Sequence, residues 1–128
     1  MILTDTTVVI DFLRSPTARL VKIIQSHQAA ICGATLSEVY AGARSPADFK
    51  KYDKALTLFA VVAIRKKTWP NLGRNPAQLG AKGITVPFPD ALIATVAIDN
   101  DLELWNHDRH FADMQKVLPA LRLFQEPP

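Results

Sequence analysis

The amino-acid sequence predicts an α/β protein in which helices cover both faces of a central parallel β-sheet of about five strands. Short apolar segments, partly β-branched, alternate along the chain with segments of helical periodicity, as is typical of parallel strands joined by helices. The chain has 128 residues and contains no linker, internal repeat or low-complexity segment. We therefore expect a single domain over residues 1–128.

The first half of the chain starts with an apolar strand, residues 1–4, which runs directly into Asp5 and a short helix ending at Leu13. The apolar spacing after Thr17 predicts a second helix as far as His27. The next expected elements are a buried strand over 29–33, a helix from Thr35 or Ser37 to Ala43, a polar helix over 47–58 and a strand over 58–64.

The second half is expected to be irregular at first, because Pro70, Gly73 and Pro76 interrupt what would otherwise be one helix. Asn75 is a suitable cap for a short helix over 76–81, which Gly83 would close. The remaining expected elements are a helix over 89–98, a strand over 102–105, a helix near 111–118, a last strand over 121–124 and a frayed end at 127–128.

The helix expected from Pro89 to Ile98 organises the rest of the chain. Proline suits the first position of a helix, and Asp90 then lies in the first turn, where free N–H groups and the helix dipole favour an ionised carboxylate. Residues 91–98 are apolar almost all the way round, so we expect this helix to be packed on more than one side. Taken alone, Asp90 is either a cap or a ligand, and the cap is the commoner role.

Composition excludes several classes of protein. Cys32 is the only cysteine, so the chain has neither an internal disulfide nor a cysteine metal site. The apolar runs are too short to span a bilayer and no secretory leader precedes Asp5, so we expect a cytoplasmic protein without a membrane association. Fifteen Lys and Arg against twelve Asp and Glu give a net charge of +3, which is compatible with a nucleic-acid partner.

Four carboxylates are expected to meet at one edge of the sheet. Asp5 ends the first strand, Asp108 follows the strand over 102–105, and Asp90 and Glu38 lie near the starts of helices. In open parallel sheets the functional site lies outside the carboxyl ends of the strands. Because packed carboxylates repel one another, such a cluster needs a cation, and its hard oxygen ligands suit Mg²⁺ or Mn²⁺.

At these residues the sequence resembles the PIN-domain ribonucleases and, more narrowly, the VapC toxins of bacterial type II toxin–antitoxin pairs. The similarity in order and spacing extends over essentially the whole chain. The matching motifs are Asp5-Thr6-Thr7, Ser37-Glu38-Val39 with Gly42, Pro89-Asp90-Ala91-Leu92-Ile93-Ala94, and Asn106-His107-Asp108-Arg109 followed by Phe111.

The resemblance implies a Mg²⁺-dependent endoribonuclease, with Mn²⁺ as a possible substitute, that hydrolyses RNA phosphodiester bonds. It further implies homodimers and a VapB-type antitoxin whose tail lies across the acidic groove. In that reading the catalytic residues are Asp5, Glu38, Asp90 and Asp108, the metal ligands are Asp5, Asp90 and Asp108, and the substrate contacts are Thr7, Asn106 and Arg109. The chain departs from the family at Thr7, where relatives often have Ser, and at Asn106, where they often have Thr or Ser. It also departs at the Pro70–Pro76 interruption, where relatives usually have a continuous helix.

An anionic site needs surrounding cations to draw in RNA. Arg109 is the first candidate because it adjoins Asp108, although it can instead pair with that carboxylate. The other candidates are Arg14, Arg44, Lys50, Lys51, Arg65, Lys66 and Lys67. A role for His107 or His110 as ligand or general acid is the weaker hypothesis, because the acid cluster needs no imidazole. Trp69 and Trp105 are expected in the core or an interface, and most of Phe12, Leu13, Leu36, Val39 and Tyr40 in the core rather than a partner groove.

Two other functional classes remain open. A receiver-like phosphoacceptor also gathers acids at strand ends, but it wants paired acids after the first strand, where this chain has Thr6 and Thr7 beside Asp5. A phosphatase built on an Asp-x-Asp motif fails at the same place. A non-catalytic interaction module on the same fold is the second class, and the presence of all four acids argues against it.

Overall fold

Four parallel strands form the centre of the structure, a computed structural model that describes residues 1–128. The strands are β1 (Ile2–Thr4), β2 (Ala29–Ile31), β3 (Ala60–Val61) and β4 (Glu103–Trp105), and their order in the sheet is β3-β2-β1-β4. All three neighbouring pairs are parallel. The carboxyl ends of β1, β2 and β4 therefore open at the same edge of the sheet.

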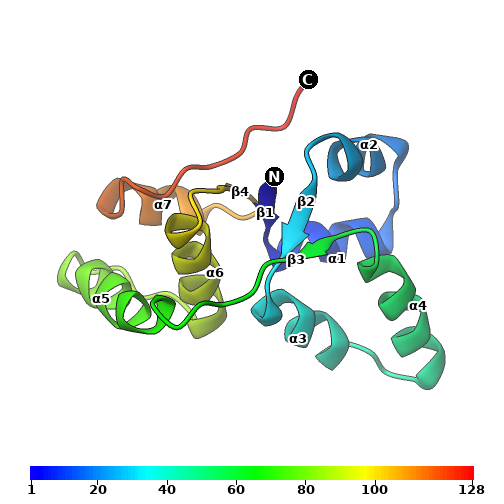
Figure 1. Cartoon of the computed structure of the whole chain (residues 1–128), viewed down its shortest axis with the longest axis horizontal. Helices are drawn as coiled ribbons and strands as arrows, with labels where there is room; N and C mark the ends of the chain where they lie inside the picture. Colours follow the sequence, from blue (N-terminus) through cyan, green and yellow to red (C-terminus); the bar gives the residue numbers. More distant parts are fainter.

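Seven helices cover the two faces of this sheet (Figure 1). Helices α5, α6 and α7 lie on one side of the strands, and α1 to α4 lie on the other. Their bounds are α1 (Thr6–Arg14), α2 (Ala18–Ser26), α3 (Gly33–Ala41), α4 (Pro46–Leu56), α5 (Thr68–Ala81), α6 (Phe88–Asp99) and α7 (His110–Val117). The predicted α/β class with both faces covered is confirmed.

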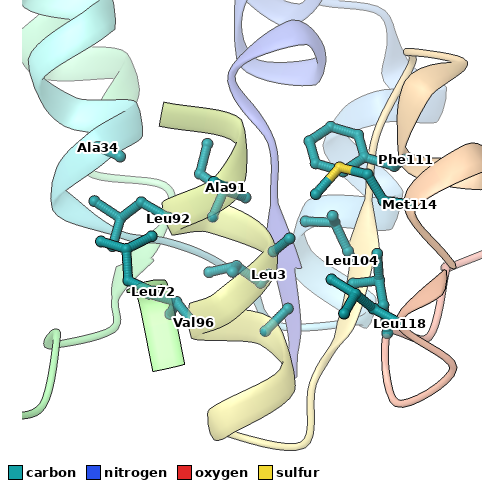
Figure 2. Close-up of a cluster of buried hydrophobic side chains, with 14 of the residues drawn as sticks. Leu3, Ala34, Leu72, Ala91, Leu92, Val96, Leu104, Phe111, Met114 and Leu118 are labelled. Atoms are coloured by element: carbon teal, nitrogen blue, oxygen red, sulfur yellow. The ribbon is translucent and has the colours of Figure 1, made fainter. Parts of the chain in front are cut away.

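The sheet separates two apolar cores because successive side chains of a strand point to opposite faces. Leu3 and Leu104 belong to the core under α5, α6 and α7, which Figure 2 shows with Phe111 and Met114 packed against them. Ile2 and Trp105, their neighbours in sequence, belong to the core on the α1 to α4 side. Burial of both faces explains why the central strands β1 and β2 are almost wholly apolar rather than alternating.

Helix α6 has no solvent-facing stripe. Seven consecutive residues, Ala91 to Ala97, are buried, and the helix contacts α3, α5 and β4. The expectation of a helix packed on more than one side is confirmed. Such a helix holds its first turn, and with it Asp90, in a fixed position.

The predicted fifth strand over 121–124 is wrong as a strand. The segment makes only a single parallel bridge, from Leu123 to Leu104 on β4. The strand expected over 58–64 also shrinks to Ala60–Val61, so the sheet has four strands rather than about five. Both segments are still extended along the sheet edges, but their pairing with β4 and β2 is too brief to form longer strands.

The predicted break at Pro70–Pro76 is wrong as well, because α5 runs unbroken through both prolines. Pro70 lies in the first turn, where a backbone N–H has no intrahelical partner to lose. Pro76 lies inside the helix, where packing on α6 and a hydrogen bond from Asn75 Nδ2 to Thr95 Oγ1 (3.1 Å) hold the chain in place.

The end of α5 is the predicted one. Gly83 has φ +78°, its N–H donates to the Gly80 carbonyl (3.0 Å), and the Ile84 N–H donates to the Leu79 carbonyl (2.9 Å). These two bonds form a Schellman motif, which requires a left-handed residue after the helix and so favours glycine.

Other expectations have mixed outcomes. No helix has both the length and the apolar character needed to cross a bilayer. Cys32 is free and buried. Trp105 lies in the core as expected. Trp69 is 52% exposed, so of the two expected locations only an interface stays a prediction for it. Phe12 and Val39 are core residues, as expected of most of their set.

Candidate active site

The four predicted carboxylates converge at the carboxyl edge of the sheet. Asp5 directly follows β1, Asp108 lies in the loop after β4, and Asp90 is the third residue of α6. Glu38 lies in the second turn of α3, because that helix begins at Gly33 rather than at Thr35 or Ser37. Burial is the main reason that the pKa values of Asp5 and Asp90 are raised. The charge of Asp108 adds to the rise at Asp5, and the charges of Asp5 and Glu38 add to the rise at Asp90, so the four carboxylates are electrostatically coupled.

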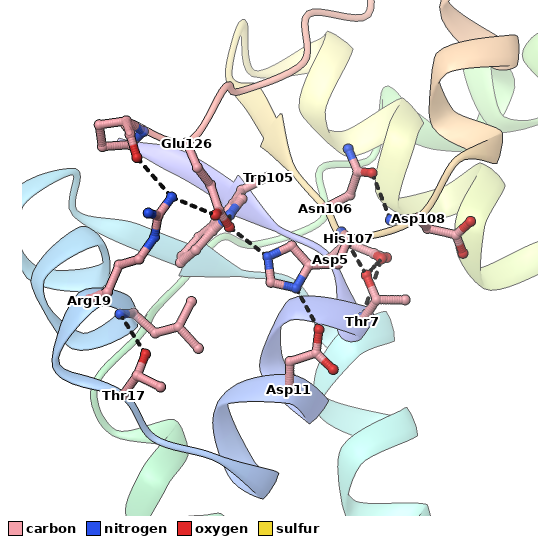
Figure 3. Close-up of polar contacts among 12 residues, drawn as sticks. Asp5, Thr7, Asp11, Thr17, Arg19, Trp105, Asn106, His107, Asp108 and Glu126 are labelled. Atoms are coloured by element: carbon pink, nitrogen blue, oxygen red, sulfur yellow. Dashed lines mark hydrogen bonds and ion pairs between the residues drawn. The ribbon is translucent and has the colours of Figure 1, made fainter.

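Asp5 is the most enclosed of the four, with 2% of its surface exposed. Its Oδ2 accepts hydrogen bonds from the Thr7 N–H (3.2 Å) and from Thr7 Oγ1 (2.6 Å), which makes Asp5 the N-cap of α1. Burial raises the pKa of this carboxyl, and the bonds from Thr7 offset only part of the rise. The predicted Thr7 thus contacts the first carboxylate directly (Figure 3).

Asp90 does not cap its helix. No side chain caps α6, although Asp90 lies in its first turn. Its Oδ2 lies 3.1 Å from His110 Nε2, and the same nitrogen lies 2.8 Å from Asp108 Oδ2. Burial and the charge of Asp5 raise the pKa of Asp90, while His110 lowers it. The Asp90 carboxylate therefore makes no capping hydrogen bond to α6 and is available to bind a ligand.

The Thr6 hydroxyl holds Glu38. Its Oε1 accepts a hydrogen bond from Thr6 Oγ1 (2.7 Å), which also lies 3.2 Å from Thr35 Oγ1. Both threonines are buried, whereas the Glu38 side chain reaches solvent. Because Thr6 adjoins Asp5, this contact orients Glu38 toward the same site.

The loop after β4 is shaped by its own polar side chains. Asn106 Oδ1 accepts from the Asp108 N–H (3.0 Å), and Asp108 Oδ1 accepts from the His110 N–H (3.2 Å). The His107 N–H donates to Thr7 Oγ1 (3.1 Å), which ties this loop to the start of α1. The predicted Asn106 thus positions Asp108. Arg109 is exposed and forms no ion pair with that carboxylate.

The donor chemistry of the site fits a hard divalent cation. The candidate ligating atoms are carboxylate oxygens, which Mg²⁺ and Mn²⁺ prefer. A cation would favour the ionised forms of Asp5 and Asp90, whose pKa values are raised mainly by burial and further by neighbouring carboxylates. In this structure the side chains do not form a ready group of three His, Cys, Asp or Glu residues that could hold a metal ion. His110, a cation when protonated, instead joins Asp90 to Asp108.

His110 and His107 both contact residues of the site, although the sequence favours them only weakly as functional residues. His107 Nδ1 lies 2.5 Å from Asp11 Oδ2 and its Nε2 lies 2.5 Å from Glu126 Oε1. Burial alone lowers the pKa of His107, but these two carboxylates outweigh it and raise the pKa. Burial raises the pKa of Glu126, but the hydrogen bond with His107 and its other polar contacts outweigh this effect, so the pKa is lowered. The one sequence feature that could have indicated a role for His110 in the site is its position two residues after Asp108.

A hollow of about 810 Å³ opens beside the carboxylates and shares His110 with them. Lys82 and Lys116 line it, and neither was among the predicted cations. By contrast, Arg65 Nη2 donates to the Asp99 carbonyl (2.8 Å) at the far end of α6, so this predicted cation lies at the opposite edge of the sheet. Arg14 and Lys51 line a separate hollow of about 340 Å³.

Comparison with protein families gives one match that spans most of the chain. The sequence model described as "PIN domain" matches residues 2–117. No curated protein sequence matches the chain.

Several solved structures share the fold over nearly their whole length. VapBC2 from Rickettsia felis, bound to a DNA fragment from its promoter, has a TM-score of 0.85 at 20% identity and covers 97% of this chain and 98% of its own. DNA-bound VapBC from Salmonella typhimurium has a TM-score of 0.81 at 21% identity, with the same coverage. VapBC-1 from nontypeable Haemophilus influenzae has a TM-score of 0.77 at 17% identity and covers 98% of each chain.

Proposed function

Because the chain belongs to the PIN domain family, we propose that it is a Mg²⁺-dependent endoribonuclease and the VapC-type toxin of a toxin–antitoxin pair. One observation carries the proposal: Asp5, Glu38, Asp90 and Asp108 reach one edge of the sheet from four distant parts of the chain. Solved structures of the same fold that are VapBC complexes support the assignment to a toxin–antitoxin pair.

The residues divide the work of hydrolysis between them. Asp5, Asp90 and Asp108 would hold the metal, which lowers the pKa of water and neutralises charge on the phosphoryl oxygens. Glu38 would either complete a second metal site or orient the attacking water and accept its proton. The water oxygen would bond to phosphorus as the bond to the 3′ oxygen breaks. The 3′ oxygen would take a proton from solvent and Glu38 would return its proton to solvent, which leaves a 5′-phosphate and a 3′-hydroxyl.

Substrate approach is favoured on the side of the 810 Å³ hollow. Lys82 and Lys116 line this hollow together with His110, and a negatively charged RNA strand needs such cations. Asp113 also lines it and pairs with Lys116 (3.5 Å), so Lys82 is the cation without a carboxylate partner there. Thr7 and Asn106 hold the proposed metal ligands in position. The Thr7 hydroxyl donates to Asp5 Oδ2, and Asn106 Oδ1 accepts from the Asp108 N–H. Arg109 remains free to contact a phosphate.

The experiment is an RNA cleavage assay with the wild type and with the Asp90→Asn variant, each in Mg²⁺, Mn²⁺ or EDTA. Asp90 caps nothing, so its amide variant is expected to fold normally and to lose activity at least about a hundredfold. Asp101→Asn is the matched control, because Asp101 is 93% exposed and lies far from the site. Cleavage that persists in Asp90→Asn or in EDTA would contradict the proposal.

The partner proposal rests on a different surface. Ile10, Leu13 and Val39 give the 340 Å³ hollow an apolar lining, and Arg14 and Lys51 give it a basic rim, which suits an amphipathic antitoxin segment. Co-purification with the product of a neighbouring short gene, lost in the Arg14→Glu/Lys51→Glu variant, tests it. The proposed homodimer is tested by light scattering, and a cytoplasmic location by fractionation. A chain that binds its antitoxin but never cleaves RNA would be the non-catalytic module.

A further inference from the structure

The last residues of the chain are bonded to the molecule rather than frayed, contrary to expectation. The Leu104 N–H donates to the Arg122 carbonyl (2.8 Å), and the Phe124 N–H donates to the Leu104 carbonyl (2.9 Å). Arg19 Nη2 donates to the Pro127 carbonyl (2.7 Å). The C-terminal segment, residues 121–127, therefore follows β4 toward the carboxyl edge of the sheet.

Glu126 is the polar anchor of this segment (Figure 3). Its Oε1 accepts from Trp105 Nε1 (2.8 Å) and lies 2.5 Å from His107 Nε2, while its Oε2 pairs with Arg19 Nη2 (3.2 Å). These partners come from α2, from β4 and from the loop after β4. One carboxylate thus joins the end of the chain to the loop that carries Asp108.

His107 links the C-terminal segment to α1 on the opposite side of the site. Its other ring nitrogen lies 2.5 Å from Asp11 Oδ2 on α1, so the imidazole spans α1 and the C-terminal segment. Its backbone N–H donates to Thr7 Oγ1, which in turn donates to Asp5 Oδ2. The neighbour of His107 in sequence is Asp108. The chain of bonds therefore runs from Glu126 to both Asp5 and Asp108.

We propose that Glu126 and His107 are positioning residues: the C-terminal segment clamps the loop after β4 and so fixes Asp108 relative to Asp5. The inference rests on the proposed function for its effect on cleavage, while the clamp itself is a statement about the structure. Neither residue is one of the proposed metal ligands. A misplacement of Asp108 by about 1 Å would lower kcat by roughly a hundredfold.

The test compares Glu126→Ala with Glu103→Ala in the full chain. Glu103 starts β4 at the other edge of the sheet and has no side-chain hydrogen bond or ion pair, so it controls for loss of a glutamate. Amide hydrogen exchange in the metal-free protein is the first readout. We expect the His107 and Asp108 amides to exchange at least about tenfold faster in Glu126→Ala and unchanged in Glu103→Ala, with the β1 amides protected in both.

RNA cleavage is the second readout. We expect kcat of Glu126→Ala to fall by about tenfold to a hundredfold with KM within about twofold, and Glu126→Gln to recover part of the loss because its amide oxygen still accepts from Trp105 Nε1. Unchanged exchange at His107 and Asp108, or faster exchange with wild-type kcat, would overturn the inference. A wild type that cuts no RNA would refute the proposed function, and the exchange result would still decide whether the clamp exists.

Discussion

The replacement of Asp5 separates the structural from the catalytic role of this carboxylate. Both hydrogen bonds from Thr7 converge on one oxygen, Oδ2, so the single amide oxygen of Asp5→Asn can keep both, whereas Asp5→Ala loses both. Loss of an N-cap costs about 1 kcal/mol. The Thr7 hydroxyl would still accept from the His107 N–H but would lose the acceptor for its own proton, which costs about 1 kcal/mol more. We therefore expect Asp5→Ala to be less stable than Asp5→Asn by about 2 kcal/mol, or roughly 6–10 °C in Tm.

The comparison of Asp5→Asn with the wild type has a definite sign. Burial raises the pKa of Asp5 in the folded state, so the ionised group destabilises the fold above that pKa, and the penalty disappears as pH falls toward the ordinary value. The Asn variant is expected to be at least as stable as the wild type at neutral pH, with a gap that closes on acidification. It should also have lost cleavage.

Urea unfolding followed by tryptophan fluorescence measures these differences, because Trp105 is fully buried and reports loss of the core. The exposed Asp101→Asn serves as the control for removal of a surface charge. An Asp5→Asn variant that is less stable than the wild type at every pH, or as unstable as Asp5→Ala, would refute the reasoning about the cap and the buried charge.

Three further expectations follow from particular residues. The acid limb of the kcat/KM profile should lie at higher pH than for an ordinary carboxylate, because the pKa values of Asp5 and Asp90 are both raised and the metal needs ionised ligands; an ordinary acid limb argues against their role. Gly83→Ala should lower the free energy of unfolding by about 1 kcal/mol with cleavage unchanged, because the site has φ +78°, and thermal unfolding checks this. Pro76→Ala should raise the free energy of unfolding by about 2 kcal/mol, because α5 regains an N–H that can donate to the Leu72 carbonyl. A lower free energy of unfolding in this variant would show that the proline is required.

The fold class was predictable because local sequence carries it. Apolar runs for strands, caps at Ser45 and Thr17 and the terminating Gly83 all act within a few residues of their position. The unbroken α5 was not predictable from the same signals, because packing on α6 outweighs the local cost of Pro76. The fifth strand failed for a related reason, since its pairing with β4 depends on a partner distant in sequence.

In the candidate site too, residues marked by local sequence features were predictable, and contacts between distant residues were not. Its four acids were found from strand ends and helix starts, which are local features. His110 was undervalued because its importance lies in two distances, to Asp90 and to Asp108, which no periodicity shows. Glu126 was missed altogether, because nothing near it in sequence indicates that its carboxylate meets residues 19, 105 and 107.

The C-terminal segment also closes an open flank of the sheet. An edge strand with free N–H and C=O groups is a template on which another chain can add a strand, and this is a route to aggregation. On one flank β3 is only two residues long, and on the other the backbone of Leu104 in β4 is occupied by Arg122 and Phe124. Shortening the chain before residue 121 would expose β4. We expect such a chain to self-associate during expression and to be recovered as insoluble protein, so that its activity could not be measured.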